Sequence, residues 1–558
     1  MDKKRLNTIL LLTFMFSLFM LWDAWERAHK PPPAPAVEAT AETGAVPGAP
    51  AAVPSVATAS AVPTIASAAP AASLPGTGVP KATVKTDLFS AEISAQGGDL
   101  VFLELEKHRA TLDASKNFIL FQNDAKQHIY VGQSGLIGEG LPNHKTMYSL
   151  EKSEYTLADG QEAVSVRLTA PAANGVKVAK IYTFKRGSYI IDVSYELSNT
   201  SAAPLTPYAY FQILRDGKEP DSATSGAFGV TTFTGPAVYT DADKFQKVKF
   251  EEITKDKAKY AHKADNGWIG LVQHYFFSAW LPQGKVEREF YIDKLGADLF
   301  RAGVKFPLDT IAPGKTGKVE VPLYAGPQEQ DKLESIAPGL DLVVDYGWLT
   351  IVASPLFWVM EKIHGQLGNW GWTIIALTVL LKLIFFPLSA ASYKSMAKMR
   401  VVMPQMTRLK DSYKDDRAKL NQEMMELYKR EKINPLGGCL PVLVQIPVFI
   451  ALYWVLLGTV EMRGAPWLGW ITDLSVQDPY YILPLLMGAS MFFQTRLNPT
   501  PPDPVQAKVM TWMPVLFTVM FLWFPAGLVL YWTVNNLLSI AQQWHVTKKI
   551  EEAAAAKR

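Results

Sequence analysis

The chain has 558 residues, of which 49% are hydrophobic and 19% are charged, and its net charge is only +3. A charge balance this close to neutral gives no indication of nucleic-acid binding, so no specific DNA binding is expected. The single cysteine, Cys439, excludes an internal disulfide framework and any multi-thiolate metal site. The eight histidines show no ligand spacing, and no metal or cofactor is expected.

The N-terminus joins a basic cluster, Lys3-Lys4-Arg5, to an uncharged stretch from Leu6 to Trp22. That stretch is long for the apolar part of a signal peptide, and charged residues follow where a cleavage site needs small ones. Residues 1–23 are therefore predicted to be an uncleaved membrane anchor with a cytoplasmic basic end. Residues 24–81 are mostly Ala and Pro and are predicted to form a disordered tether.

Between residues 82 and 340 the hydrophobic pattern has a period of two. Val164, Val166 and Leu168 alternate with polar residues, and turn pairs such as Asn174-Gly175 separate the apolar runs. Many short alternating strands without long helical stretches predict a large antiparallel β-sandwich, closed by a short helix around residues 328–336. Because the anchor begins in the cytoplasm, this domain is expected outside the cytoplasm.

Beyond residue 345 the chain becomes strongly apolar. Residues 370–388 are predicted to be the second transmembrane helix, and residues 439–545 are predicted to contain four more. The five predicted spans are Trp370–Leu388, Leu440–Gly458, Tyr480–Thr495, Val509–Phe524 and Ala526–Trp544. The last two could form one helix, but Pro525-Ala526-Gly527 between them favours a tight hairpin.

The positions of the basic residues decide the predicted topology. Residues 389–438 carry 11 Lys or Arg against 6 Asp or Glu, and such loops stay in the cytoplasm. Residues 341–369 are therefore predicted to be an amphipathic helix at the outer interface, with Pro355 breaking it, rather than another span. The tail, residues 546–558, is basic and cytoplasmic. This gives six transmembrane helices with both termini in the cytoplasm.

The basic loop, residues 389–438, is predicted to be a hairpin of two amphipathic helices with a polar turn at Asp411–Asp416 and a kink at Pro404. Methionine suits a surface that adapts to varied apolar segments, so the methionine row is a candidate contact surface for another chain, although it could equally fill the hairpin seam. The loop's positive charge could meet ribosomal RNA or lipid headgroups. The candidate hairpin residues are Met396, Met399, Met403, Met406, Lys410 and Arg417.

Lys382 is the one ionisable side chain predicted at depth in the five spans, which contain no Asp or Glu. A cation in hydrocarbon costs a few kcal/mol and normally faces a partner or water. It lies on one helix face with Thr378, and other spans add Gln445, Tyr531, Trp532 and Asn535. This coincidence predicts a wet cavity, open to the cytoplasm, that accepts a visiting anion. Lys382 could instead snorkel to headgroups, and the amides could join helices.

The sequence does not indicate an enzyme. No nucleophile, base and orienting group can be assembled from Cys439, Ser490 and His364, and a coupled pump needs carboxylates along its path. A protein that translocates lipids or anionic solutes remains an alternative, with Lys382 as its anion site.

Several blocks of the C-terminal part closely resemble the YidC insertase family, and the resemblance covers essentially the whole chain. The blocks are Ser395-Met396-Ala397-Lys398-Met399, Asn434-Pro435-Leu436-Gly437-Gly438-Cys439, Gln445-Ile446-Pro447, Asp478-Pro479-Tyr480-Tyr481-Ile482-Leu483-Pro484, Phe524-Pro525-Ala526-Gly527-Leu528-Val529-Leu530-Tyr531-Trp532 and Asn535-Asn536-Leu537.

This resemblance implies a polytopic α-helical membrane protein with a five-helix insertase core in the bacterial inner membrane. It implies a positively charged hydrophilic groove in which Lys382 takes the place of the family's usual arginine, alongside Thr378, Gln445, Tyr531 and Trp532. The implied partners are nascent membrane proteins, the Sec translocon, the ribosome or a targeting particle, and membrane lipids. The outer domain resembles sugar-mutarotase-related sandwiches, although its motifs offer no active site.

Overall fold

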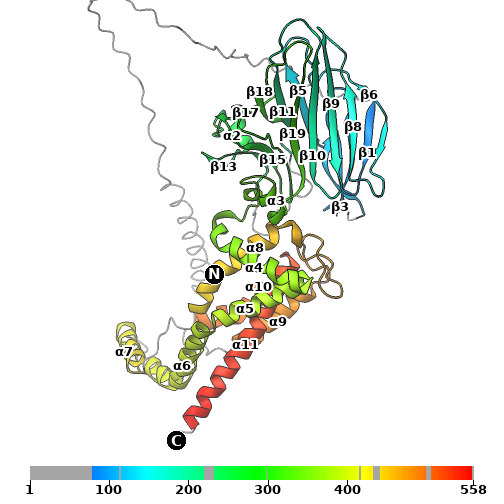
Figure 1. Ribbon diagram of the computed structural model, residues 1–558. Coiled ribbons are helices and arrows are strands. Elements are labelled where there is room, and N and C mark those ends of the chain that lie inside the picture. Colours follow the sequence, from blue (N-terminus) through cyan, green and yellow to red (C-terminus); the bar gives the residue numbers. More distant parts are fainter. Residues whose placement is uncertain are drawn as a thin grey trace, which may run out of the picture. The chain divides into compact units, whose positions relative to one another are not determined.

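The structure is a computed structural model of the chain (Figure 1). It describes residues 78–558 except 112, 114, 219–231, 297, 414–415, 432–439, 498–503 and 556–558. The predicted anchor, residues 1–23, and nearly all of the predicted tether lie outside the described residues, as does Cys439.

Two β-sheets form the first part of the described chain, with ten strands in the order β14-β17-β18-β11-β5-β4-β3-β2-β1-β7 and nine in the order β13-β12-β15-β16-β19-β10-β9-β8-β6. Their bounds are β1 (Lys81–Lys85), β2 (Phe89–Ser94), β3 (Leu100–Arg109), β4 (Asn117–Asn123), β5 (Ile129–Ile137), β6 (Ser149–Leu150), β7 (Glu154–Thr156), β8 (Ala163–Thr169), β9 (Val176–Lys185), β10 (Ile190–Asn199), β11 (Tyr208–Asp216), β12 (Gly235–Thr240), β13 (Lys244–Lys247), β14 (Lys263–Ala264), β15 (Trp268–Val272), β16 (Phe276–Trp280), β17 (Arg288–Lys294), β18 (Leu299–Pro307) and β19 (Thr316–Pro327).

The predicted alternation explains how the two sheets share a core. In β8, Val166 and Leu168 are completely buried, whereas the alternating residues Ser165 and Arg167 are exposed. Buried residues of both sheets join one apolar cluster, as in a sandwich. The pairing is antiparallel throughout the described strands except between β1 and β7, which are parallel.

A turn predicted from the sequence connects β8 to β9. Asn174 and Gly175 have φ angles of 51° and 74°, so both adopt the left-handed conformation. Two such residues in succession match the twist of a β-hairpin, and Asn and Gly tolerate this conformation best. The Asn-Gly pair therefore fixes the position of this hairpin.

Helices follow the sheets, and two short ones lie within or just after them. Their bounds are α2 (Phe250–Thr254), α3 (Gln330–Ile336), α4 (Thr350–Leu367), α5 (Trp370–Ile384), α6 (Phe386–Ser412), α7 (Arg417–Arg430), α8 (Leu440–Gly458), α9 (Ile482–Leu497), α10 (Pro504–Phe521) and α11 (Ala526–Ala555), with 3-10 turns η1 (Asp341–Val343), η2 (Gly347–Leu349) and η4 (Val460–Met462).

Prolines shape these helices differently from the predictions. The expected break at Pro355 is wrong, because α4 runs through it with the proline side chain exposed. Helix α6 continues through Pro404, and the kink expected there stays a prediction. The predicted span to Leu388 is also wrong at its end: α5 stops at Ile384 and α6 begins two residues later at an angle of 65°. Pro387 causes this break, because it has no N–H to continue the hydrogen-bond ladder of α5.

Pro525 separates the last two helices, as the sequence predicted. Helix α10 ends at Phe521 and α11 begins at Ala526, but α11 runs to Ala555, well beyond the predicted end at Trp544. Among the described residues, no individual helix has both the length and the apolar composition needed to cross a bilayer, whereas α5 and α6 meet that criterion as a bent pair.

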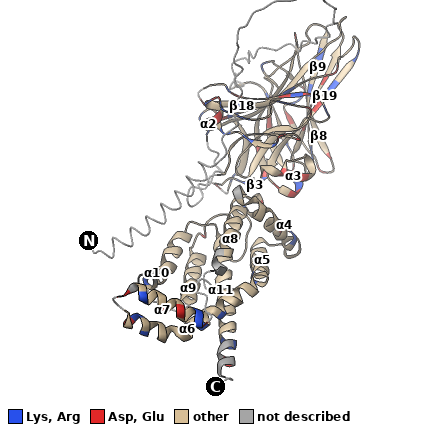
Figure 2. Cartoon of the chain, turned by 90° about the vertical axis from the view of Figure 1, so that its left-hand side faces the viewer, with Lys and Arg blue, Asp and Glu red and all other residues tan. Residues whose placement is uncertain are grey.

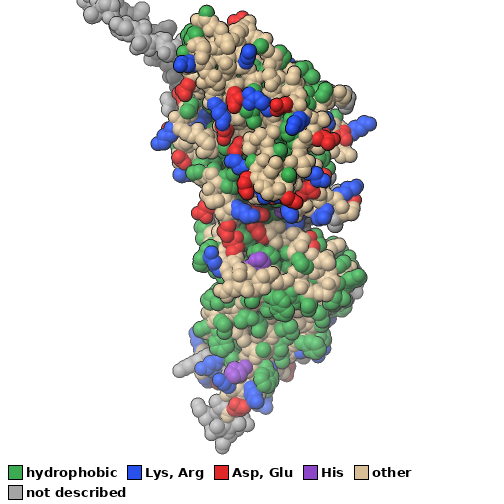
Figure 3. All heavy atoms as spheres, turned by 45° about the vertical axis from the view of Figure 1, so that its right-hand side comes forward, with side chains coloured by type: hydrophobic (Ala, Val, Ile, Leu, Met, Phe, Trp, Pro, Cys, Tyr) green, Lys and Arg blue, Asp and Glu red, His purple; other side chains and the backbone are tan. Residues whose placement is uncertain are grey.

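The surface of the helical part differs in character from that of the sheets. Figure 3 shows hydrophobic side chains gathered over the helices and mixed charges over the sheets. On α10, Trp512 and Leu516 are 68% and 67% exposed, and on α9 Phe493 is 64% exposed. Figure 2 shows Lys and Arg on α6 and α7. Large exposed apolar side chains at this density are typical of a surface that contacts lipid.

The turn between α10 and α11 pairs with the segment that precedes α9. The N–H of Ala526 donates to the carbonyl of Val476 at 2.7 Å, and the N–H of Gly527 donates to that of Leu474 at 2.9 Å. Asp478, which is completely buried, accepts hydrogen bonds from indole Nε1 of Trp470 and from the backbone N–H groups of Tyr480 and Leu483. This carboxylate therefore fixes the start of α9 next to the α10–α11 turn.

We predict that Asp478→Ala lowers the stability of the helical part by about 2–3 kcal/mol, because it removes the acceptor of three hydrogen bonds and leaves the buried N–H of Leu483 without a partner. The matched control is Asp473→Ala, because Asp473 is half-buried and accepts from the backbone N–H and the hydroxyl of Ser475, so its loss should cost about 1 kcal/mol. The midpoint of thermal unfolding of the full chain in detergent compares the two variants. Equal midpoints would contradict the assigned role of Asp478.

Candidate functional site

Lys382 lies in the last turn of α5, two residues before the helix ends at Ile384. Its residue is only 6% exposed, and its ammonium Nζ donates to hydroxyl Oγ of Ser539 on α11 at 2.6 Å. Because α5 ends at Ile384, Lys382 lies closer to a helix end than the predicted helix to Leu388 implies. At this place the carbonyl groups of the helix C-terminus stabilise a positive charge.

A chain of hydrogen bonds connects Lys382 to two other helices. Ser539 donates in turn to the carbonyl oxygen of Asn535 at 2.7 Å, and Nε2 of Gln445 on α8 donates to Oδ1 of Asn535 at 2.8 Å. We call Lys382, Gln445, Asn535 and Ser539 the polar cluster. The polar cluster joins α5, α8 and α11. The sequence predicted polar residues on each of these helices, but not which of them contact one another.

Lys382 has no carboxylate partner in the part of the chain that the structure describes. The ion pairs of the described residues lie elsewhere, and its recorded hydrogen bond is to a hydroxyl group. A buried ammonium normally has an anion or several acceptors around it. The polar cluster thus holds a positive charge that its described residues do not neutralise.

Other polar residues surround the cluster. Thr378 is buried one turn before Lys382, but its hydroxyl donates to the carbonyl of Ile374 in its own helix. Ser389 and Ser392 on α6 are buried, and Nδ2 of Asn536 donates to Oγ of Ser490 on α9 at 3.2 Å. Ser392 was not among the predicted site residues, although its three-residue spacing from Ser389 places both on one helix face.

Tyr531 and Trp532 lie in apolar surroundings. Tyr531 is 2% exposed and belongs to the apolar core of the helices. The indole of Trp532 packs against Phe449 and Phe521, with ring centroids 4.7 and 5.6 Å apart. Among the described residues, its Nε1 has no hydrogen-bond partner. The structure therefore brings Lys382, Gln445 and Asn535 together and places Trp532 in an aromatic wall instead.

The methionines of the α6–α7 hairpin mostly fill its seam. Met406 is buried with Val402 and Leu427, and Met399 and Met403 pack against this small cluster. Met396 and Lys410 are half-buried outside it, and the side chain of Arg417 lies outside the described residues. The large apolar side chains that the hairpin exposes are instead Val401, at 77%, and Met425, at 53%, which the sequence analysis did not select.

The base of the hairpin is attached to the end of α9. The guanidinium of Arg400 on α6 and the amide Nε2 of Gln543 on α11 both donate to the carbonyl of Leu497, the last residue of α9. The C-terminal carbonyls of a helix have no partner within the helix, and basic side chains satisfy them well. Arg400 therefore sets the position of the hairpin relative to the α9–α11 pair.

Comparisons with known proteins agree over the full length. The family model described as YidC periplasmic domain matches residues 81–359, and the model described as 60Kd inner membrane protein matches residues 362–553. The membrane protein insertase YidC of Aromatoleum aromaticum is 62% identical over 560 residues, covering 100% of each chain. That of Dechloromonas aromatica is 57% identical, covering 100% of this chain and 99% of its own. A crystal structure of an active YidC insertase covers 84% of this chain and 92% of its own at 17% identity, with a TM-score of 0.41.

We predict that Arg400→Ala loosens the hairpin base without unfolding the protein. Losing this exposed charge-assisted hydrogen bond should cost about 1 kcal/mol, so amides near residue 400 should exchange with solvent about fivefold faster. Hydrogen–deuterium exchange of the full chain measures this, and Arg400→Lys should recover part of the protection. Arg408→Ala is the matched control, because Arg408 is exposed on the same helix. Equal exchange in the two alanine variants would contradict the anchoring role.

Proposed function

The chain belongs to the YidC family of membrane protein insertases, and we propose that its polar cluster receives the hydrophilic segment of each client during insertion. As a member of this family it acts on nascent membrane proteins, in the inner membrane with a periplasmic domain, and it is not an enzyme.

One observation supports the proposed role of the cluster: Lys382 is a buried ammonium whose recorded partner is a hydroxyl group. A hydroxyl holds the side chain in place but does not cancel its charge. An acidic or strongly polar client segment can therefore exchange with Ser539 and gain a charge-assisted hydrogen bond. Gln445 and Asn535 offer further donors and acceptors in the same cluster. Together these groups would replace the hydrogen bonds to water that the segment loses when it leaves the cytoplasm.

The proposed cycle needs no nucleotide. The client's hydrophilic segment enters the polar cluster from the cytoplasm, and its apolar span then moves into lipid. Burial of that span gives about 25 cal/mol for each Å² removed from water, and the membrane potential adds a contribution for charged segments. The 16 residues of α9 are only about 24 Å long, and short spans thin the surrounding bilayer. A thinner bilayer shortens the distance that the segment must cross.

The proposed topology keeps the six transmembrane helices and the two cytoplasmic termini expected from the charge pattern. In this arrangement α4 lies at the outer interface, and the α6–α7 hairpin and the tail, residues 546–558, face the cytoplasm. We also propose that the hairpin meets the nascent chain, the ribosome or a targeting particle, and that the Sec translocon and lipids are further partners. The exposed side chains of Val401 and Met425, rather than the seam methionines, supply an apolar contact surface for this purpose.

We predict that the charge of Lys382 matters more than its shape. Lys382→Arg should preserve insertion, Lys382→Ala should weaken it, and Lys382→Glu should weaken it most for clients with acidic hydrophilic segments. Two unit charges about 4 Å apart interact by about 4 kcal/mol at an effective dielectric near 20, and water in the site reduces this. The measurement is insertion of paired clients that differ by one or two acidic residues, with the abundance of each variant determined in parallel.

The matched control for charge reversal is Lys394→Glu, because Lys394 is exposed on α6 outside the polar cluster. It should affect acidic and neutral clients alike and only slightly. Equal losses for both clients in all Lys382 variants would refute the charge mechanism. Loss of lipid or anionic-solute movement with unchanged protein insertion would favour the alternative of a translocator that uses the same cation.

A further inference from the structure

Two ionisable side chains, Asp99 and Lys180, lie in the core between the two sheets, and the proposed function does not use them. Asp99 directly precedes β3 of the ten-stranded sheet, Lys180 belongs to β9 of the nine-stranded sheet, and both residues are 0% exposed. Nζ of Lys180 donates to the carbonyl of Gly97 at 3.1 Å. Oδ2 of Asp99 accepts from Nε2 of Gln133 at 2.7 Å. The recorded hydrogen bonds of the two side chains are thus to other groups and not to each other.

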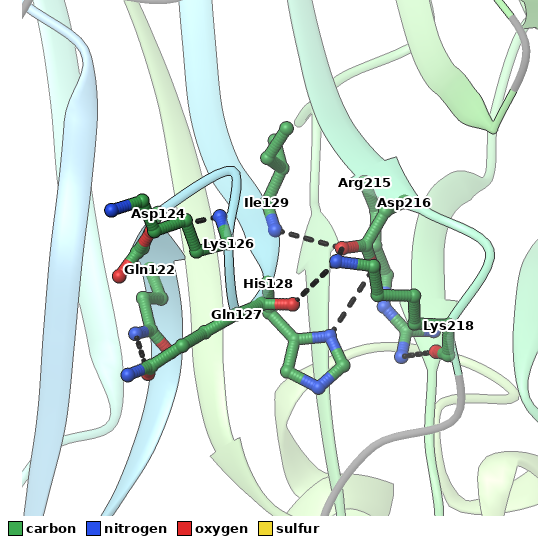
Figure 4. A network of polar contacts seen from close by, with 9 residues as sticks. All are labelled: Gln122, Asp124, Lys126, Gln127, His128, Ile129, Arg215, Asp216 and Lys218. Atoms are coloured by element: carbon green, nitrogen blue, oxygen red, sulfur yellow. Dashed lines mark hydrogen bonds and ion pairs between the residues drawn. The ribbon is translucent and has the colours of Figure 1, made fainter.

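A second buried carboxylate of the sheets, Asp216, shows how such a group is normally compensated (Figure 4). Its Oδ2 accepts from the backbone N–H of Ile129 at 2.9 Å, and its Oδ1 lies 3.3 Å from Nδ1 of His128. Burial acts to raise the pKa of Asp216, but the hydrogen bonds from His128 and Ile129 outweigh burial, so this pKa lies below its ordinary value. Both oxygens of the carboxylate have partners, and the charged form is favoured.

Asp99 lacks this compensation. Among the described residues, its Oδ1 has no hydrogen-bond partner. Burial raises the pKa of Asp99 to about 7, although Lys180 and the hydrogen bond from Gln133 act in the opposite direction. An ionised carboxylate with one bare oxygen is costly in a dry core, whereas the protonated form costs much less.

The other titratable groups around Asp99 and Lys180 keep their charge state between about pH 5 and pH 7. They are Tyr148 before β6, Tyr182 on β9, Tyr195 on β10, Tyr210 on β11 and His144 in the connection from β5 to β6. Burial holds the pKa of each tyrosine above its ordinary value and lowers the pKa of His144 to about 4. Burial also lowers the pKa of Lys180 to about 8, because the attraction of Asp99 offsets it only in part. Asp99 is therefore the member of this group that changes charge in that range.

The sign of the effect on stability follows from these values. The folded chain binds the Asp99 proton more tightly than the unfolded chain, where the pKa has its ordinary value of 3.8, so protonation stabilises the fold. This contribution is complete below pH 3.8 and is lost as the pH rises to about 7. Lys180 has the opposite sign, because its pKa falls from 10.5 to about 8, and its contribution is lost as the pH falls through 8. The pair therefore destabilises the sheets most between about pH 7 and pH 8.

The pair lies at a contact that connects the two sheets. Gly97 and Gly98 form the turn between β2 and β3, with φ angles of 72° and 58°. Their carbonyls accept from Nζ of Lys180 at 3.1 Å and from the hydroxyl of Tyr182 at 2.6 Å. A Cβ at Gly98 would lie 2.9 Å from Cδ of Lys180, so the turn and β9 are in close contact. A proton on Asp99 removes a bare charge from this contact, whereas ionised Asp99 favours the entry of water.

We propose that Asp99 is a proton-binding residue of the sheet part, and that uptake of its proton strengthens the contact between the Gly97-Gly98 turn and β9. The sheet part belongs to the periplasmic domain, so the pH around it is that outside the cytoplasm. The sheets thus become more resistant to opening as that compartment acidifies. The proposal concerns the sheets alone and does not depend on the role proposed for the polar cluster.

The test compares the unaltered full chain in detergent with Asp99→Asn, which has nearly the shape of the protonated side chain and carries no charge. A short pulse of protease in urea measures the unfolded fraction of the sheet part, and hence its unfolding equilibrium constant, at about pH 5 and about pH 8. Between these two pH values, the constant of the unaltered chain should rise relative to that of Asp99→Asn by a factor on the order of ten to a hundred. The same ratio at both pH values would overturn the proposal.

The matched control is Asp113→Asn. Hydrogen bonds from Ser115 hold the pKa of Asp113 below its ordinary value, so the charge of this carboxylate does not change above about pH 5. The ratio of the unfolding constants of the unaltered chain and Asp113→Asn should therefore be the same at both pH values. A ratio that changes as much as that of Asp99→Asn would also count against Asp99 as the proton-binding residue.

A second measurement uses the unaltered sequence, so it does not depend on the folding of a variant. The full chain is labelled with carbon-13 in its aspartate carboxyl groups, and its infrared spectrum is recorded as the pH rises. The label separates the carbonyl band of a protonated aspartic acid from the bands of glutamic acids. We expect a protonated aspartic acid band at about pH 6 that disappears by about pH 8. A spectrum without this band at about pH 6 would contradict the proposal.

Discussion

Pro387 sets the geometry on which the functional part depends. Because a proline has no backbone N–H, α5 ends at Ile384 and α6 begins at Phe386 at 65° to it. The break places Lys382 in the last turn of α5, where the helix carbonyls favour a cation, and directs its side chain to Ser539. The same break starts the first helix of the hairpin. One residue thus positions both the cation and the element proposed to receive the client.

The long helix α11 connects the remaining parts of the site. It packs against α5, α6, α8 and α9, and it carries Asn535, Ser539 and Gln543 at four-residue intervals along one face. Asn535 and Ser539 hold Gln445 and Lys382, and Gln543 reaches the end of α9 beside Arg400. At its other end the backbone of Ala526 and Gly527 pairs with the segment before α9. The polar cluster, the end of α9 and the segment before α9 therefore all contact this one helix.

The sheet part and the helical part are joined by polar contacts that surround a cation. Arg463 lies among the rings of Phe118, Tyr275 and Phe276, and Nε2 of His274 is 2.8 Å from the carbonyl of Leu457. Burial and the charge of Arg463 lower the pKa of His108 in the same region to about 4, so this imidazole stays neutral. These contacts hold the loop after α8 against β4, although β4 and that loop are far apart in sequence.

Sequence alone determined those features that depend on local chemistry. Alternation predicted the strands, Asn174-Gly175 predicted a turn, and Pro525 separated α10 from α11, because each follows from the conformational limits of a few consecutive residues. Which residues meet depends on contacts between helices and strands that local patterns do not encode. Tertiary packing alone decided that Lys382 binds Ser539, that Trp532 joins Phe449 and Phe521, that the methionines fill a seam, and that β4 diverges from β5. Helical spacing assigns residues to a face, but the neighbouring element determines whether that face meets polar groups, apolar side chains or solvent.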